Sequence, residues 1–426
     1  MTLILMVVGV LVLLAVRVPV AIALLVPSMV YIAVTPGVSM DVAMQQTLSG
    51  VNSFPILAVP LFILLGNLAN DSGITDRMYA AAVAFLGHFR GSLGYVNIAT
   101  SFGFSWMSGA AIADAAAMGR MQVPQMVKRG YPAGFSVGLT GASSLVAPII
   151  PPSIAAIVYA VTAGLSVGAL FLVGLVPALL LIVALCITVW WRLRKRDDLR
   201  GERTGWGERM RSLLGALPPA GAAVVILGSI LLGMATPTEA AGLGVVYVLT
   251  LSIVYRKFTW KSVIKSLVQT AQTSGSVLLI VATAALFGWV LARERAPQAA
   301  ADALLGITTY TVVFLIIVNV LLLIVGALLE STSAILILVP VLAPVAETFG
   351  VHPFHFAAIV IFNLLLGLLT PPVGMVLFVL SSTTGYKVST IIRGVVPFYV
   401  PMLAVLLLIT FFPAISTTLP LMLGYA

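Results

Sequence analysis

Two proline pairs interrupt long apolar stretches of the chain and recur at a fixed spacing. Pro151-Pro152 and Pro371-Pro372 lie 220 positions apart. Proline removes a backbone donor and pushes the residue before it out of the α region, so neither stretch can form one continuous helix. Matched breaks in two halves of a chain indicate an internal repeat. Two further pairs match at the same offset: Pro124 with Pro344, and Gly130 with Gly350.

The composition places these breaks inside a membrane protein. The chain is 61% hydrophobic and only 8% charged, which excludes ordinary soluble folds. Its first apolar run has no basic segment before it and no cleavage site after it, so we expect an uncleaved first span. We therefore expect an all-α polytopic membrane protein. The candidate spans are roughly 2–16, 18–34, 54–70, 78–88, 92–118, 168–191, 218–234, 238–254, 272–292, 310–329, 335–347 and 395–412.

The segments around the proline pairs are predicted to be re-entrant helical hairpins, over about 131–163 and 355–385. Open backbone groups are tolerated at membrane depth only where protein or a water-filled cavity receives them. An extended tip with free carbonyls suits a hard monovalent cation, and the amide ends of half-helices suit an anion. The residues predicted to contact an anionic substrate are Ser143, Ser144, Ser153, Thr370 and Pro371.

A basic segment divides the chain almost in half. Residues 192–211 hold eight basic and four acidic side chains, and Lys/Arg-rich loops beside membrane spans lie in the cytoplasm. We expect residues 1–191 and 212–426 to be two repeats, which are inverted relative to each other if each half has an odd number of crossings. Both termini would then lie outside. The charge of the linker favours anionic lipid headgroups over nucleic acid as its contact.

The chain offers little for catalysis. It has three His, no Gly-x-Ser-x-Gly elbow, no glutamate-bearing zinc motif and no phosphate-binding Gly-Lys-Thr/Ser loop. We expect neither an enzyme nor a bound cofactor.

Two carboxylates lie in apolar surroundings, and each has two interpretations. Burying a carboxylate in a membrane costs free energy, so such residues are candidates for function. Asp114 either caps or hinges a helix or takes part in coupling, and Glu330 is either a helix-end feature or a coupling group.

Five motifs follow one another along the chain in a recognisable order. The chain resembles the large membrane (permease) subunit of tripartite ATP-independent periplasmic (TRAP) transporters, the family of DctM and SiaM, over essentially its whole length. The motifs are Gly109-Ala-Ala-Ile-Ala-Asp-Ala-Ala-Ala-Met-Gly119, Ala147-Pro-Ile-Ile-Pro-Pro-Ser153, Ser166-Val-Gly-Ala-Leu-Phe-Leu-Val-Gly174, Thr236-Pro-Thr-Glu-Ala-Ala241 and Gly367-Leu-Leu-Thr-Pro-Pro-Val-Gly374.

This resemblance implies an elevator mechanism, in which a scaffold holds a mobile transport domain. It implies sodium-driven import of a small organic acid anion across the bacterial inner membrane, with Na⁺ as the coupling ion. A periplasmic substrate-binding protein would deliver the substrate, and a small four-helix membrane subunit would be a separate polypeptide. The implied sodium ligands are Ser105, Ser108, Ala147, Ile150 and Pro152 at the first site, and Gly326, Gly367, Thr370 and Val373 at the second.

The sequence leaves other questions open. Ala147 stands where the family commonly has glycine, and a methyl group disfavours left-handed backbone geometry there. A stand-alone sodium/dicarboxylate-type symporter and a subunit needed only for assembly are the alternative functions. Dicarboxylates, sialic acids, keto acids, sugar acids and sulfonates all remain possible substrates.

Overall fold

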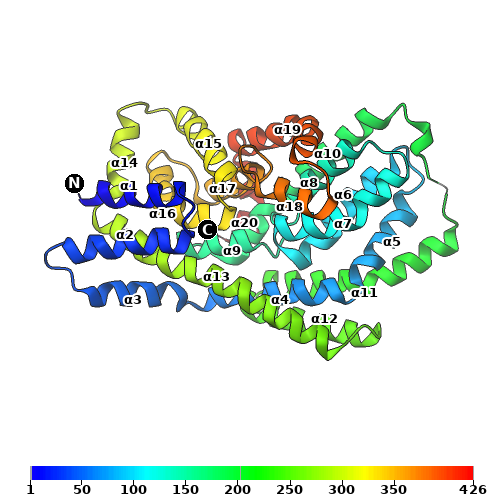
Figure 1. Cartoon of the computed structure of the whole chain (residues 1–426), viewed down its shortest axis with the longest axis horizontal. Coiled ribbons are helices and arrows are strands. Elements are labelled where there is room, and N and C mark those ends of the chain that lie inside the picture. Colours follow the sequence, from blue (N-terminus) through cyan, green and yellow to red (C-terminus); the bar gives the residue numbers. More distant parts are fainter. Residues whose placement is uncertain (1, 202, 426) are drawn as a thin grey trace.

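The fold is helical throughout. The computed structural model describes residues 2–201 and 203–425, and this part of the chain forms twenty α-helices and two short 3-10 helices with no strand (Figure 1). Eight of the described helices are long and apolar enough to cross a membrane. The prediction of an all-α, multi-pass membrane protein is confirmed.

The helices fall into two series separated by the basic linker. The first series is α1 (Thr2–Ala15), α2 (Val20–Val34), α3 (Met40–Val51), η1 (Phe54–Leu57), α4 (Ala58–Asp71), α5 (Ile74–Leu86), α6 (Ser92–Ser108), α7 (Ala111–Lys128), α8 (Ala133–Ser144), α9 (Ile154–Ala163) and α10 (Val167–Leu193). The linker contains η2 (Asp197–Leu199). The second series is α11 (Trp206–Leu231), α12 (Pro237–Val254), α13 (Trp260–Arg293), α14 (Ala296–Leu305), α15 (Thr311–Leu328), α16 (Ser331–Thr348), α17 (Pro353–Gly367), α18 (Met375–Thr384), α19 (Val388–Phe411) and α20 (Ala414–Met422).

The offset of 220 relates whole helices as well as prolines. Moving α6 to α10 forward by 220 positions places each of them on its counterpart among α15 to α19, within a few residues at either end. Among the described elements, α20 has no α-helical counterpart in the first series, and one further helix differs in kind. The first series breaks between α3 and α4, where Pro55 lies in η1, whereas the corresponding α13 contains no proline and runs unbroken for 34 residues. Figure 1 shows α3 and α4 lying along α13, which contacts both.

Contacts between the two series are reciprocal. Helix α7 packs on α18, and their counterparts α16 and α9 pack on each other. Likewise α8 packs on α19, and α17 packs on α10. Reciprocal contacts of this kind are the pattern of a two-fold axis, here a pseudo-two-fold axis within one chain.

One sequence prediction needs correction. The span predicted over 92–118 is two helices, because Gly109 has a left-handed backbone (φ 54°) and ends α6. The segments predicted as re-entrant hairpins, 131–163 and 355–385, do break at the prolines. Each arm of the first segment packs on other elements: α8 packs on α7 and α19, and α9 packs on α16. Helices α3, α14 and α20 lie outside the predicted spans.

Glycines let the two series approach closely. A methyl group built on Gly138 of α8 would meet the backbone of Gly394 in α19, and one on Gly394 would meet the backbone of Gly134. Close backbone approach across small residues is the usual way for helices to pack in a membrane. The contact joins the two halves beside the broken helices.

Candidate ion and substrate site at the broken helices

The first tip, residues 145–153, is fully enclosed. Every residue from Leu145 to Ser153 is buried. Ser153 holds the end of the loop, because its hydroxyl accepts from the amide of Ala156 at 3.1 Å and donates to the carbonyl of Pro148. Serine at this position is a favourable N-cap, so the sequence itself starts α9 there.

The first tip rests on the turn between α6 and α7. The amide of Ile154 donates to the carbonyl of Gly109 at 3.4 Å, and a methyl group on Gly109 would lie 2.7 Å from the carbonyl oxygen of Pro152. This contact brings the end of α6, which carries Ser105 and Ser108, beside the tip. The buried hydroxyl of Ser108 has no hydrogen-bond partner among the described residues, whereas Ser105 donates to the carbonyl of Phe102.

The second tip, residues 368–374, rests on the corresponding turn between α15 and α16. The amide of Gly374 donates to the carbonyl of Ala327 at 3.1 Å. The backbones of Gly326 and Gly367 touch, and a methyl group on Gly367 would collide with Gly326. Thr370 donates from its amide to Gly367 at 2.8 Å and from its hydroxyl to the carbonyl of Leu366 at 3.0 Å.

Several tip carbonyls lack donors. In the described part of the chain, no hydrogen bond reaches the carbonyls of Ala147, Ile150 or Pro152. The carbonyls of Thr370 and Val373 are also without donors among those residues. Buried carbonyls are nearly always paired, so the unpaired carbonyls of the enclosed first tip are candidate ligands for a cation.

The two tips differ in exposure. Ala147 is 0% exposed and Ile150 7%, while Val373 of the second tip is 36% exposed. Pro371 and Pro372 are exposed as well. In this conformation only the second tip is open to its surroundings.

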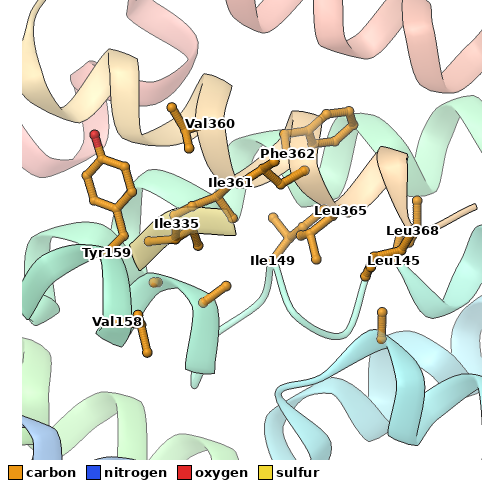
Figure 2. Close-up of a cluster of buried hydrophobic side chains, with 14 of the residues drawn as sticks. Leu145, Ile149, Val158, Tyr159, Ile335, Val360, Ile361, Phe362, Leu365 and Leu368 are labelled. Carbon is orange, nitrogen blue, oxygen red and sulfur yellow. The ribbon is translucent and has the colours of Figure 1, made fainter. Parts of the chain in front are cut away.

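An apolar seam joins the two broken segments. Figure 2 shows Leu145 and Ile149 of the first tip within one cluster with Leu365 and Leu368 of the second segment. Ile149 and Phe362 line a void of only about 20 Å³. The first tip is therefore packed against α17, and no substrate-sized cavity separates them.

The serines predicted to contact substrate are committed to internal hydrogen bonds. Ser143 donates to the side-chain oxygen of Asn97 at 2.7 Å, and Ser144 donates to the carbonyl of Gly141 at 2.8 Å. Both are fully buried, and Ser153 is 1% exposed. The structure places these three serines inside the protein, whereas Pro371 of the second tip is exposed.

The two carboxylates occupy different settings. Asp114 is fully buried in α7, where one carboxylate oxygen accepts from Ser101 at 3.0 Å and the other has no partner among the described residues. It links α6 to α7 and does not cap a helix. Glu330 is the N-cap of α16 and accepts from the amide of Ser333 at 3.1 Å, which fits the helix-end interpretation.

Three buried asparagines were not singled out from the sequence. Asn97 donates to Thr140 at 2.8 Å, and Asn363 donates to the side chain of Asn319 at 2.7 Å. Each bond ties a broken segment to its neighbouring helix, α8 to α6 and α17 to α15. The signal was present, because an amide inside a long apolar run needs a partner. Position 363 also matches Ser143 at the repeat offset.

Comparison with known proteins decides the family. Residues 7–415 match the family described as Tripartite ATP-independent periplasmic transporter, DctM component. The chain belongs to this family. It is 40% identical over 400 residues to the sialic acid TRAP transporter large permease protein SiaM of Vibrio cholerae, covering 93% of this chain and 94% of that protein.

Other similarities agree. This DctM-family chain is 36% identical to the C4-dicarboxylate TRAP transporter large permease protein of Rhodobacter capsulatus, over 91% of both proteins. Among solved structures, the crystal structure of the Alcanivorax borkumensis YdaH transporter matches with a TM-score of 0.59 at 16% identity, over 98% of this chain and 99% of that one. That match supports the fold alone. The protein is a large TRAP permease subunit and is not an enzyme.

Proposed function

We propose that this TRAP permease subunit couples sodium to the import of a carboxylate-bearing organic acid and holds one Na⁺ at each tip. The unpaired carbonyls of the buried first tip carry the proposal, since carbonyl oxygens at an unwound helix suit Na⁺. At the second tip, the end of α15 adds the partial negative charge of a helix C-terminus near Gly326.

The substrate proposal rests on the relatives and on the exposed tip. The two relatives described above are named for sialic acid and for C4-dicarboxylates, and both kinds of compound carry carboxylates. Thr370 and Pro371 at the exposed second tip are the residues that we assign to substrate contact. Ser143, Ser144 and Ser153 would position the backbone and contact substrate only if the first tip opened.

An elevator movement is part of the proposal. A cavity of about 600 Å³ lies between helices α3 and α13 on one side and helices α9 and α16, which we assign to the mobile domain, on the other. The α13 side of this cavity is lined largely by small residues, including Ala284, Ala285 and Gly288. Small side chains leave a smooth surface along which a packed group of helices can slide. The proposed partners are a small membrane subunit and a periplasmic binding protein.

Sodium dependence at Thr370 tests the proposal. Thr370→Val keeps the side-chain shape but removes a hydroxyl, so the sodium concentration for half-maximal uptake should rise about tenfold, the loss of one ligand being worth roughly 1–2 kcal/mol. The measurement is uptake by the complete transporter in proteoliposomes at varied external sodium.

Thr188→Val is the matched control. Thr188 of α10 also donates its hydroxyl to a carbonyl four residues back, at 2.8 Å, and lies far along the chain from either tip. Unchanged sodium dependence in Thr370→Val at normal yield would remove Thr370 from the ion site.

A stand-alone sodium/dicarboxylate symporter is not favoured, because the matched relatives are TRAP permeases.

A further inference from the structure

A basic cavity lies away from the tips, where the start of α8 meets the end of α10 and the start of α19. Its volume is about 590 Å³. Among the described residues that line it there is no carboxylate, and four side chains are basic: Arg192, Lys195, Arg196 and Arg393. Three come from the end of α10 and the start of the basic linker, and one comes from α19.

Most of this positive charge is uncompensated within the protein. Arg196 forms an ion pair with Asp198 at 2.7 Å, and this guanidinium holds the pKa of the Asp198 carboxyl below its usual range. In the described part of the chain, Arg192, Lys195 and Arg393 have no carboxylate within 4.0 Å. Like charges gathered around one cavity repel one another, and an anion in the cavity would relieve that repulsion.

The backbone adds to the same field. Helix α8 has 12 residues, begins at Ala133 after Pro132, and has no side-chain cap. Its first amides therefore lack helical partners, and the positive end of its dipole lies at Gly134 and Phe135, which line the cavity. The N-terminus of α8 and the basic side chains therefore both favour an anion in this cavity.

The position of the cavity indicates what kind of anion. Arg192 directly follows Trp190 and Trp191, which are both more than half exposed, and aromatic side chains of this kind mark the membrane–water interface. Basic pockets between helices at this depth bind the phosphates of anionic lipids. Arginine also forms two parallel hydrogen bonds to a phosphate, which lysine cannot do.

We propose that this cavity is a binding site for a phosphate-bearing anion, contacted by Arg192, Lys195 and Arg393. The bound phosphate would join α10 of the first repeat to α19 of the second, next to the close contact between Gly138 and Gly394. The lipid phosphodiester and free inorganic phosphate share this chemistry, so the test separates them.

The test uses the transporter complex in phosphatidylcholine nanodiscs that contain a minor fraction of phosphatidylglycerol. Retained phosphatidylglycerol is counted by native mass spectrometry. The double substitution Arg192→Gln with Arg393→Gln should weaken retention about tenfold or more. The single substitution Arg393→Lys, with Arg192 unchanged, should keep most of the retained phosphatidylglycerol. The matched control removes two exposed charges elsewhere, Lys257→Gln with Lys261→Gln, and should retain the lipid.

Each outcome is informative. Equal retention in the wild type and the Arg192/Arg393 variant, or equal loss in the Lys257/Lys261 control, would overturn the site. If added inorganic phosphate displaces phosphatidylglycerol from the wild type and not from the variants, the site also binds free phosphate. Retention unaffected by phosphate would identify a lipid site. Melting temperatures of all variants exclude loss through unfolding.

Discussion

At the scale of single residues, the second tip depends on contact between two glycines. Gly326 and Gly367 touch backbone to backbone, so neither position has space for a side chain. This contact holds the end of α15 against the end of α17 and so places the residues of the proposed second ion site together. The glycines are therefore structural requirements of the site, whether or not their own carbonyls bind the ion.

Gly367→Ala tests this requirement. The added methyl group would collide with the backbone of Gly326, and we expect a loss of roughly 1–3 kcal/mol of stability together with weakened sodium dependence of uptake. Gly242→Ala in α12 is the control, because nothing lies within 4 Å of the added atom there. The control should leave stability unchanged or raise it by up to about 1 kcal/mol. Both are measured as melting temperature and uptake, and equal melting temperatures would contradict the collision.

Asp114 is predicted to act through its hydrogen bond to Ser101. Asp114→Asn keeps an oxygen for that bond and should preserve yield and sodium-dependent uptake. Asp114→Leu removes this acceptor and leaves Ser101 only its longer hydrogen bond to Ser143, at 3.3 Å, at a cost of about 1–3 kcal/mol. Yield, melting temperature and uptake are compared for both variants. A well-folded Asp114→Asn protein without sodium-dependent uptake would show instead that the carboxylate charge takes part in coupling.

At the scale of helices, the breaks could be predicted from sequence and their packing could not. Proline acts on its own backbone and on the residue before it, so the positions of both breaks followed from Pro151-Pro152 and Pro371-Pro372 alone. The partner of each arm depends on which apolar faces meet across the whole molecule. The packing of α9 on α16, at least 168 positions away, has no local signal. The turn at Gly109 was missed because the small residues on both sides of it resemble one closely packed membrane helix.

The different exposure of the two tips predicts different chemical reactivity. In a Cys186→Ala background, Val373→Cys should react rapidly with a maleimide, and Ile150→Cys should be protected, because these positions are 36% and 7% exposed. Sodium should slow the reaction at position 373 if the carbonyl of Val373 binds the ion. Labelling is followed by the mass of the purified protein. Equal rates at the two positions would show that the first tip opens readily.

At the scale of the whole molecule, α6 to α10 and α15 to α19 are matched series that pack reciprocally. The prolines and glycines matched at 220 positions predict two repeats, and the helix boundaries recur at the same offset. The break between α3 and α4 was not predicted as a difference between the copies, although Pro55 is present in one copy and absent from the other. The all-α membrane fold could be predicted from the high hydrophobic and low charged content, because a chain that spans a membrane has few folds open to it.

The orientation of the copies remains a prediction with a direct test. We expect both termini outside and the 192–211 segment in the cytoplasm, because that segment holds eight basic residues. In Cys186→Ala cells, a membrane-impermeant maleimide should label Leu423→Cys and leave Arg203→Cys unlabelled until the membrane is opened. Both side chains are exposed, so access to the solvent on one side of the membrane is the variable tested. The reverse pattern would refute this topology.

Because of the spacing of 220, almost every position has a matched position in the other half of the same polypeptide. Ala147 and Gly367 are one such pair, with a methyl group in one copy and none in the other. Exchanging the two residues, singly and together, compares both ion sites in one protein at one expression level and in one membrane. Each half of the chain thus supplies the reference for measuring how differently the other half uses the matched position.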